Sequence, residues 1–373
     1  MNSKERHEAR YQRRKQKREK KRMEVAKEYG DFNTVFTFDH LYNSYKNCCL
    51  GVGWKASTQR YKSNALANVN DTLNLLQNNN YKSKGFYEFD IVERGKLRHI
   101  KSVHISERIV QRCLCDYSLV PMFERSFIYD NGACMRNKGI DFAVNRFTCH
   151  LQRHWRKYGN SGYVLLFDFS RYFDNIQHEP LKQIVDKYYM GERIKTLIKQ
   201  FIDDFGDIGL GLGSQISQVS ALMYPNKLDH YIKEILHVKG YGRYMDDGYL
   251  IHESKKYLQK CLVEIRQICG ELGIKLNTKK TQIVKMSKGV NFLKSKFIFN
   301  DTGKVIRKPN HKSIKKMRHK LKTFKKWQTE SRMTIDAIKR SYESWKGHLK
   351  HFNAYSIIVR IDEVFNNLFE DKI

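Results

Sequence analysis

The chain of 373 residues carries 70 Lys and Arg residues against 39 Asp and Glu, which gives a formal net charge of +31. This positive charge exceeds what solubility requires and favours a polyanionic partner, either nucleic acid or an anionic membrane surface. No segment approaches the ~20 apolar residues of a membrane-spanning helix, and the first 22 residues lack the apolar stretch of a secretory signal, so we expect a cytoplasmic protein without membrane association.

The N-terminal segment is the most strongly basic part of the chain. Its first 22 residues contain eleven Lys and Arg, three Glu and almost no large apolar residue. This composition predicts a solvated basic arm over residues 1–30, which serves either as a solubilising tail or as an RNA-binding arm. Aromatic and aliphatic residues return from Phe32 onward, and the alternation of residues 86–91 predicts a strand.

The middle of the chain predicts a layered α+β structure. Residues 162–169 form a short, nearly continuous apolar run that includes Asp168 near its end, which is typical of a strand buried on both faces. A glycine-rich stretch at 209–213 follows, and apolar residues then recur with helical spacing from 219 to 235. Residues 241–252 predict two short strands around a tight turn. Strand, helix and hairpin in this order indicate an α+β fold.

The C-terminal part has a different character. Residues 304–326 hold eleven basic and no acidic residues, and their apolar positions repeat every three or four residues. This pattern predicts an amphipathic helix with a basic face. Two further helical patterns, at 335–349 and 357–368, complete a predicted small helical domain.

Three aspartates carry the clearest chemical signal. Asp168 near the end of a buried strand and the pair Asp246 and Asp247 in a hairpin turn can meet in one cleft, because neighbouring strands lie about 5 Å apart. Nucleotidyl transfer needs carboxylates that hold two divalent cations about 4 Å apart, and such hard oxygen ligands suit Mg²⁺ or Mn²⁺. An Asp pair in a turn, taken alone, indicates only turn chemistry.

The residues around these aspartates resemble two motifs of reverse transcriptases. Tyr-Met-Asp-Asp at 244–247 is similar to the YxDD box of this family, and Phe-Asp-Phe-Ser-Arg-Tyr-Phe-Asp at 167–174 is similar to its first palm motif. The resemblance implies an RNA-directed DNA polymerase of right-hand architecture. It places the fingers at 31–150, a palm with the catalytic Asp residues at 151–303, and a helical basic thumb at 304–373. Template RNA, nascent cDNA and dNTPs are the partners it implies.

The resemblance also assigns roles within the first palm motif. It places Phe169 together with Asp168, Asp246 and Asp247 in the metal site. Phe173 falls where the family has the aromatic ring that excludes a 2′-hydroxyl, which implies deoxynucleotide substrates and disfavours an RNA-templated RNA polymerase. The alternative role of Phe173 is that of an ordinary core residue.

Further basic residues are candidates for contact with the triphosphate. Residues 95–100 and 131–139 are similar to fingers motifs of bacterial reverse transcriptases. Within them Arg136, Lys138 and Arg98 would bind the incoming nucleotide, with Arg supplying bidentate donors, or each is a solvated loop charge.

A second palm motif follows the YxDD box. The stretch 272–281 resembles the palm motif whose lysine reaches the leaving pyrophosphate as a general acid. Lys280 matches this lysine best and is assigned as catalytic, with Lys279 as a rival and a plain exposed lysine as the bland alternative. Residues 291–293 fall where the family has its primer-grip hairpin.

The segment 209–229 distinguishes between branches of the prokaryotic enzymes. Its spacing is similar to the box of diversity-generating retroelement reverse transcriptases, and Gln218 within it is expected to bind substrate. Gly211 replaces the usual proline of that box, and residues 214–216 depart from its usual Asn-Leu-Thr. Membership of this branch implies frequent errors at template adenines, and an accessory protein or a structured non-coding RNA as a further partner.

Two alternatives remain beside this assignment. Bacterial anti-phage defence reverse transcriptases are divergent and of similar size, so they compete for the same sequence features. A catalytically idle RNA-binding protein on a polymerase scaffold is the other alternative. The intact aspartates argue against it, because clustered carboxylates are electrostatically costly unless a cation neutralises them.

Overall fold

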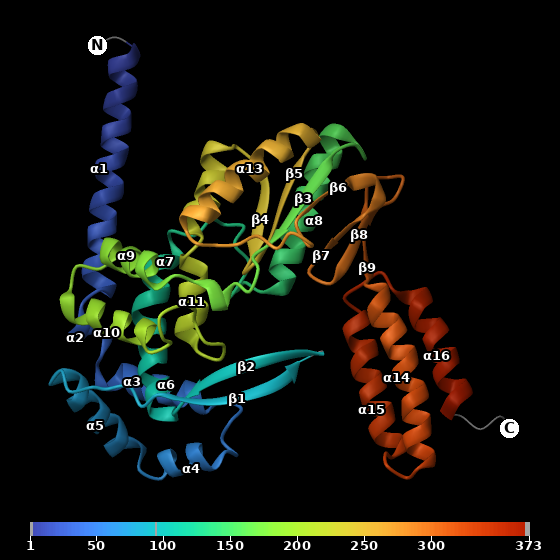
Figure 1. Cartoon of the computed structure of the whole chain (residues 1–373), viewed down its shortest axis with the longest axis horizontal. Coiled ribbons are helices and arrows are strands. Elements are labelled where there is room, and N and C mark those ends of the chain that lie inside the picture. The colour runs from blue at the N-terminus through green and yellow to red at the C-terminus, as the bar shows by residue number, and fades with distance from the viewer. Residues whose placement is uncertain (1–2, 94, 370–373) are drawn as a thin grey trace.

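The computed structural model describes residues 3–93 and 95–369. Its first element is a long helix, α1 (Ser3–Tyr29), that projects from the body of the molecule (Figure 1). Only the last part of α1 joins the core, where Val25 and Ala26 are buried. The predicted solvated arm is therefore helical, and its final residues belong to the folded body.

A helical region with one β-hairpin follows α1. The hairpin pairs β1 (Phe86–Glu93) with β2 (Lys96–Val103), so the strand predicted from residue 86 is present. Both strands are largely exposed. The helices of this region are α2 (Phe32–Val35), α3 (Phe38–Cys49), α4 (Ala56–Lys62), α5 (Ala65–Gln77), α6 (Ile105–Leu114), a π-helical turn (Cys115–Leu119) and α7 (Val120–Glu124).

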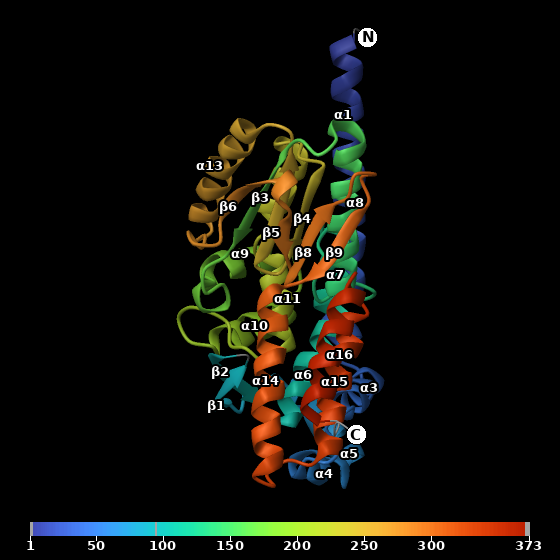
Figure 2. The same cartoon turned by 90° about the vertical axis from the view of Figure 1, so that its right-hand side faces the viewer.

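A four-stranded antiparallel sheet forms the centre of the molecule. Its strand order is β4-β5-β3-β6, and its members are β3 (Tyr163–Asp168), β4 (Gly240–Tyr244), β5 (Asp247–His252) and β6 (Gln282–Lys285). Every residue of β3 after its first is buried, which confirms the predicted doubly covered strand. Helix α8 (Ile140–Tyr158) covers one face and α13 (Lys255–Glu271) the other (Figure 2).

Alternation along β3 explains this double cover. Val164 and Leu166 pack in the cluster that includes α8 side chains, whereas Leu165 and Phe167 pack in the main core with α13. Successive side chains of a strand point to opposite faces, so a strand between two helices must be apolar throughout. The remaining helices of this region are α9 (His178–Tyr188), α10 (Glu192–Asp203), α11 (Gln215–Met223), α12 (Asn226–His230) and a π-helical turn (Tyr231–Ile235).

The C-terminal region differs from the sequence prediction at its start. The helix predicted from residue 304 begins only at His311, and β9 (Val305–Pro309) precedes it. This strand completes a three-stranded sheet with β7 (Val290–Phe292) and β8 (Ser295–Phe299). The prediction was wrong here because a basic run does not reveal pairing with β8, which satisfies the backbone of β9.

Three helices then form a bundle with its own core, around Leu321, Ile338 and Ile361. They are α14 (His311–Thr329), α15 (Ile335–Leu349) and α16 (Tyr355–Phe369), and the last two lie close to the predicted ranges.

Arg307 of β9 clasps the bundle to the three-stranded sheet. Its backbone N–H donates to Asn353 Oδ1 at 3.0 Å, and its guanidinium donates to the carbonyl of His351 at 3.3 Å and to Ser295 Oγ at 3.0 Å. The guanidinium also lies 4.5 Å from the ring centroid of Phe352.

Among residues 3–93 and 95–369, no helix has the length and apolar content needed to cross a bilayer.

Candidate active site

The aspartates of the two sequence motifs lie side by side on the central sheet. Asp168 ends β3 and Asp247 begins β5, and the antiparallel register places these two residues opposite one another. Asp168 is buried, with 3% of its surface exposed. The expectation that the strand and the hairpin would bring their carboxylates together is therefore met for this pair.

Asp246 lies in the turn that joins β4 to β5. The preceding Met245 has a φ of 53°, a left-handed conformation that a non-glycine residue adopts only at a cost. The carbonyl of Asp246 accepts a hydrogen bond from the Phe169 N–H at 3.1 Å, which ties the turn to the end of β3. The Met245 side chain packs beside Met135 and Leu222, so local packing offsets the strain.

A buried ion pair stabilises the turn between β4 and β5. The Arg243 guanidinium makes two hydrogen bonds to the Asp229 carboxylate, at 2.8 and 2.6 Å, and neither side chain is exposed. A further guanidinium N–H donates to the Met245 carbonyl at 2.8 Å, and the Tyr241 hydroxyl donates to Asp229 at 2.5 Å. Burial lowers the pKa of Arg243, but Asp229 outweighs this and keeps it above its ordinary value.

The role of Arg243 was not predicted from the sequence. The available signal was a charged residue within a strand of otherwise small and aromatic residues, because such a position is buried and a buried charge needs a partner. Asp229 is the last residue of the 209–229 segment, and no role was predicted for it. Arg243 is best described as a positioning residue, since it holds the backbone on which Asp246 is carried.

The cluster is electrostatically unbalanced in favour of negative charge. Burial, together with the neighbouring carboxylates of Asp246 and Asp168, raises the pKa of Asp247 to about 7. Burial also raises the pKa of Asp246, with Asp168 adding to the effect. Both shifts have the sign expected for buried carboxylates that lie close together.

Lys280 provides the positive charge nearest to the cluster. Its ammonium donates a hydrogen bond to Asp168 Oδ2. Burial lowers the pKa of Lys280, but this hydrogen bond and the charge of Asp168 together raise it above its ordinary value. Lys279 is exposed, and only its backbone N–H is tied, to Asn277. The geometry thus favours Lys280 over its rival.

The loop before Lys280 explains how the lysine reaches the site. Asn277 donates its backbone N–H to the Asp168 carbonyl at 2.7 Å, and Ser170 donates to the Lys275 carbonyl at the same distance. The Asn277 side chain then accepts from the N–H of Lys279 at 3.1 Å, as in an Asx turn, and from the N–H of Lys280 at 3.3 Å. The segment continues the pairing of β3 beyond its last residue.

The donor set fits a hard divalent cation by its chemistry. Asp168, Asp246 and Asp247 offer carboxylate oxygens of the kind that Mg²⁺ and Mn²⁺ prefer. Phe169 has no ligand atom in its side chain, so only its backbone oxygen can join them. In the ranges 3–93 and 95–369, no group of three or more His, Cys, Asp or Glu side chains is spaced for metal binding. The metal site stays a prediction.

The predicted triphosphate contacts differ in their surroundings. Arg136 is exposed on a loop that runs beside β4, where Arg243 N–H donates to the Asp130 carbonyl at 3.1 Å. Lys138 on the same loop donates to the carbonyls of Tyr129 at 2.9 Å and Asn131 at 3.1 Å, so its ammonium braces the loop. Arg98 is exposed on β2 and pairs with Glu93 at 2.9 Å. Arg136 is thus the least engaged of the three candidates.

Phe173 and Gln218 lie on elements that contact one another. The Tyr172 hydroxyl donates to the Ala221 carbonyl of α11 at 2.6 Å, which fixes the Phe173 turn against this helix. Phe173 is half-buried, and its carbonyl accepts from the Leu210 N–H at 2.7 Å. Gln218 is exposed, although most of α11 is buried. The structure therefore leaves both side chains at least partly accessible.

The glycines of the 209–213 stretch allow two parts of the protein to approach closely. The Lys101 N–H donates to the Leu212 carbonyl at 3.1 Å, so this stretch pairs with β2. A Cβ at Gly211 would lie 2.8 Å from the Phe205 ring and 2.9 Å from Lys101 Cβ. Glycine is therefore needed here so that the β1–β2 hairpin can pack closely against this stretch.

Comparison with known proteins identifies the family. Residues 81–297, more than half of the chain, match the family model described as "Reverse transcriptase (RNA-dependent DNA polymerase)". The chain belongs to the reverse transcriptase family. A mixed α+β fold of right-hand polymerase type follows from this membership, as the sequence predicted. No curated protein sequence matches the chain.

Solved structures similar to this reverse transcriptase include telomerases of two Candida species. Apo telomerase of Candida tropicalis without its C-terminal domain matches with 15% identity and a TM-score of 0.44, over 60% of this chain and 55% of that one. The apo Candida tropicalis enzyme gives 13% and 0.46, over 78% and 60%. Candida albicans telomerase with a fragment of telomeric RNA gives 10% and 0.46, over 79% and 62%. The chain thus spans less than two thirds of each.

The hairpin expected at residues 291–293 of this reverse transcriptase is present as β7 and β8. Its two turn residues, Leu293 and Lys294, both have positive φ, at 45° and 62°. Two-residue hairpin turns with this geometry normally use Asn and Gly. Phe292 anchors the strained turn, because it packs against Phe147 of α8 with a ring separation of 4.9 Å.

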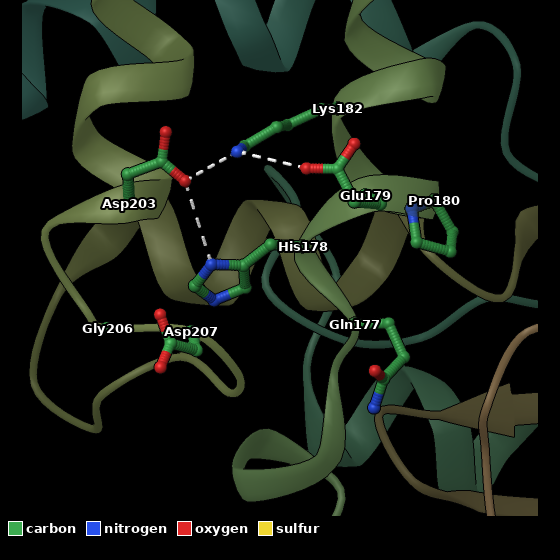
Figure 3. A pocket seen from close by; sticks show the side chains of 8 residues that line it. All are labelled: Gln177, His178, Glu179, Pro180, Lys182, Asp203, Gly206 and Asp207. Atoms are coloured by element: carbon green, nitrogen blue, oxygen red, sulfur yellow. Dashed lines mark hydrogen bonds and ion pairs between the residues drawn. The ribbon is translucent and has the colours of Figure 1, made fainter.

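A polar cavity of about 500 Å³ lies between α9 and α10 of the reverse transcriptase (Figure 3). Its lining includes none of the residues predicted for catalysis or substrate binding. His178 in its wall donates from Nε2 to the Gly209 carbonyl at 2.7 Å, and Lys182 pairs with Asp203 at 2.6 Å. The lining consists of Gln177, His178, Glu179, Pro180, Lys182, Asp203, Gly206 and Asp207.

Proposed function

We propose that this reverse transcriptase copies RNA into DNA by nucleotidyl transfer at Asp168, Asp246 and Asp247. The observation that carries the proposal is the register of β3 and β5, which sets Asp168 opposite Asp247 within two motifs of the family. Two bound cations, Mg²⁺ or Mn²⁺, would activate the primer 3′-hydroxyl and stabilise the triphosphate. Phe169 would add its backbone oxygen.

The chain's own groups then have distinct tasks. The three aspartates hold the negative charge that the cations require, and Lys280 carries a proton close to Asp168 that can pass to the leaving pyrophosphate. Exposed Arg136 binds the triphosphate, with Arg98 and Lys138 as weaker contacts, and Gln218 meets the substrate from α11. In this proposal residues 31–150 are the fingers, 151–303 the palm and 304–373 the thumb.

Primer extension on a defined RNA template tests the activity. We expect the purified chain with Mg²⁺ or Mn²⁺ to extend a DNA primer with dNTPs and to stop at the template end. The alternative of an idle RNA-binding protein predicts RNA binding without extension under every metal condition. Extension on a DNA template but not on an RNA template would contradict the proposal that the enzyme copies RNA.

Substitution of Phe173 tests substrate selection. Phe173→Val should lower the ratio of dNTP to rNTP incorporation efficiency by about tenfold or more, because removal of a ring that blocks the 2′-hydroxyl changes discrimination by at least about 1.4 kcal/mol. The measurement is single-nucleotide incorporation with matched dNTP and rNTP. Phe173→Tyr, which keeps an aromatic ring at this position, is the control and should keep the wild-type ratio. An unchanged ratio would return Phe173 to the role of a core residue.

We further propose that the enzyme belongs to a diversity-generating retroelement. The support is the 209–229 box, in which Gln218 and Asp229 keep the spacing of that branch. Gly211 and residues 214–216 depart from it, which is why the anti-phage defence branch is the second candidate. An accessory protein or a structured non-coding RNA would complete the retroelement system.

Copying fidelity discriminates between the two branches. Deep sequencing of cDNA made on a defined RNA should show errors concentrated at template adenines, with the other three template bases copied faithfully. Errors at adenines are the property that the retroelement branch implies. A uniformly low error rate, or untemplated homopolymer, would move the enzyme to the defence branch while leaving the polymerase proposal intact.

A further inference from the structure

Helix α1 stands apart from the rest of the molecule. Both views show its N-terminal part projecting beyond the body (Figures 1 and 2). Between Glu5 and Glu24 the described side chains are exposed, apart from half-buried Ala9. This projecting part of α1 has no buried face and gains nothing from tertiary packing, which indicates a role in binding a partner outside the chain.

One face of α1 is uniformly basic between residues 6 and 21. Six basic residues recur every three or four positions and so share one face, because an α-helix has 3.6 residues per turn. We call this face the basic stripe, and its ends, Arg6 and Lys21, lie about 22 Å apart along the helix axis. Glu8 and Glu19 lie on the far side, where Glu8 bonds to Gln12 at 2.7 Å. The stripe consists of Arg6, Arg10, Arg13, Lys17, Lys20 and Lys21, all of them exposed.

The base of α1 is fixed to the body. Val25 and Ala26 are buried, and the Ser118 hydroxyl donates to the Tyr29 carbonyl at 2.7 Å. The Arg22 guanidinium also lies 5.9 Å from the ring centroid of Tyr188 on α9. The stripe is thus presented in a set direction, on elements that share no residue with the aspartate cluster.

The chemistry of the stripe selects its partner. Exposed Tyr11 and Met23 are isolated and form no apolar face, so α1 lacks what a membrane-surface helix or a helix-pairing partner would bury. A row of positive charges without apolar support suits phosphates, whose contacts position a nucleic acid without reading its sequence. A rigid row about 22 Å long favours a rigid polyanion, because a single strand would lose conformational entropy on lining up with it.

We infer that α1 binds a duplex segment of RNA through the basic stripe, outside the catalytic site. This inference rests on the proposed function, since it takes the duplex to be part of the RNA that the enzyme copies. A fixed second contact raises the effective concentration of the template at the active site. The enzyme therefore holds structured RNA at one place and reads its single strand at another.

Binding of RNA by the full-length chain tests the inference without catalysis. The probes are a labelled RNA hairpin with a 20-base-pair stem and an unstructured RNA of equal charge, in the absence of dNTPs. Arg6→Gln/Arg10→Gln/Arg13→Gln/Lys17→Gln removes four stripe charges and keeps good helix formers. The matched control Lys255→Gln/Lys256→Gln/Lys260→Gln/Arg266→Gln removes four exposed charges from α13.

We expect the stripe variant to weaken hairpin binding at least tenfold, and to make the slope of log K against log salt less negative by roughly three to four. The control should bind as wild type does, and unstructured RNA should be affected less than the hairpin. If the stripe variant and the control variant lose the same affinity for the hairpin, the loss depends only on total charge, and the inference is overturned. If the stripe variant loses the same affinity for the hairpin and for unstructured RNA, the assignment of a duplex partner is overturned. Hairpin binding equal to that of the wild type would overturn it as well.

Catalysis provides a second readout. On a template whose 5′ part forms the hairpin, the stripe variant should raise KM at least tenfold and leave kcat unchanged. On a short unstructured template both constants should match wild type. A variant that extends neither template while the wild type extends both would show damage to the fold. If the wild type itself is inactive, the proposed activity fails, while the binding assay still decides the role of α1.

Discussion

Replacement of Asp168, Asp246 or Asp247 by Ala should reduce primer extension by at least about a hundredfold while RNA affinity stays close to wild type. The expected size follows from the loss of one preorganised electrostatic contact at a reacting phosphate. Stability should not fall for Asp247→Ala, because burial and like charges disfavour its ionised form in the folded state. Extension rates and RNA dissociation constants on the same preparations make the measurement.

Asp174→Ala is the matched control for these three variants. Asp174 is an exposed carboxylate six residues after Asp168, and its side chain is assigned no metal. Its substitution should leave extension unchanged. Activity of Asp168→Ala, Asp246→Ala or Asp247→Ala within about tenfold of wild type, equivalent to less than about 1.4 kcal/mol in the barrier, would remove that residue from the metal site.

Replacement of Arg243 by Met should lower the free energy of unfolding by about 3–5 kcal/mol, because it leaves the Asp229 carboxylate buried without its partner. The Met245 carbonyl would lose its donor at the same time, so the turn that carries Asp246 would be released. Extension activity should therefore fall even at temperatures where the variant stays folded. Urea denaturation followed by circular dichroism gives the stability, and primer extension gives the activity.

The double variant Arg243→Met/Asp229→Leu separates the two effects. It removes both charges, so it should recover much of the stability that the single variant loses. Activity should recover less, since no donor to the Met245 carbonyl is restored. A single variant that loses less than about 1 kcal/mol, or a double variant with full activity, would contradict the positioning role of Arg243.

The part of the site that depends on local pattern was predictable from the sequence. The continuous apolar run that includes Asp168 and the hairpin pattern around Asp246 are both local signals, and their meeting follows from strand spacing. The link from Arg243 to Asp229 joins a strand to a helix fourteen residues earlier. No periodicity reports such a pair, and only the misfit of a charge in a buried strand hints at it.

Two elements show where charge misled the prediction of structure. Eleven basic residues at 304–326 were interpreted as one helix, although Val305 and Ile306 form a strand because β8 offers them a pairing partner. The arm at 1–30 was judged by charge alone, yet it is rich in Lys, Arg, Gln and Glu, which are strong helix formers. The charge of a segment indicates which partners it can contact, whereas strand pairing and intrinsic helix propensity decide its secondary structure.

The hydrogen bonds of Arg307 connect the three-stranded sheet to the helical bundle. Arg307 bonds on one side to Ser295, beside the turn that joins β7 to β8, and on the other to His351 and Asn353 between α15 and α16. Because one side chain bonds to both parts, we expect a displacement of the helical bundle to shift Ser295 and the neighbouring β7–β8 turn as well.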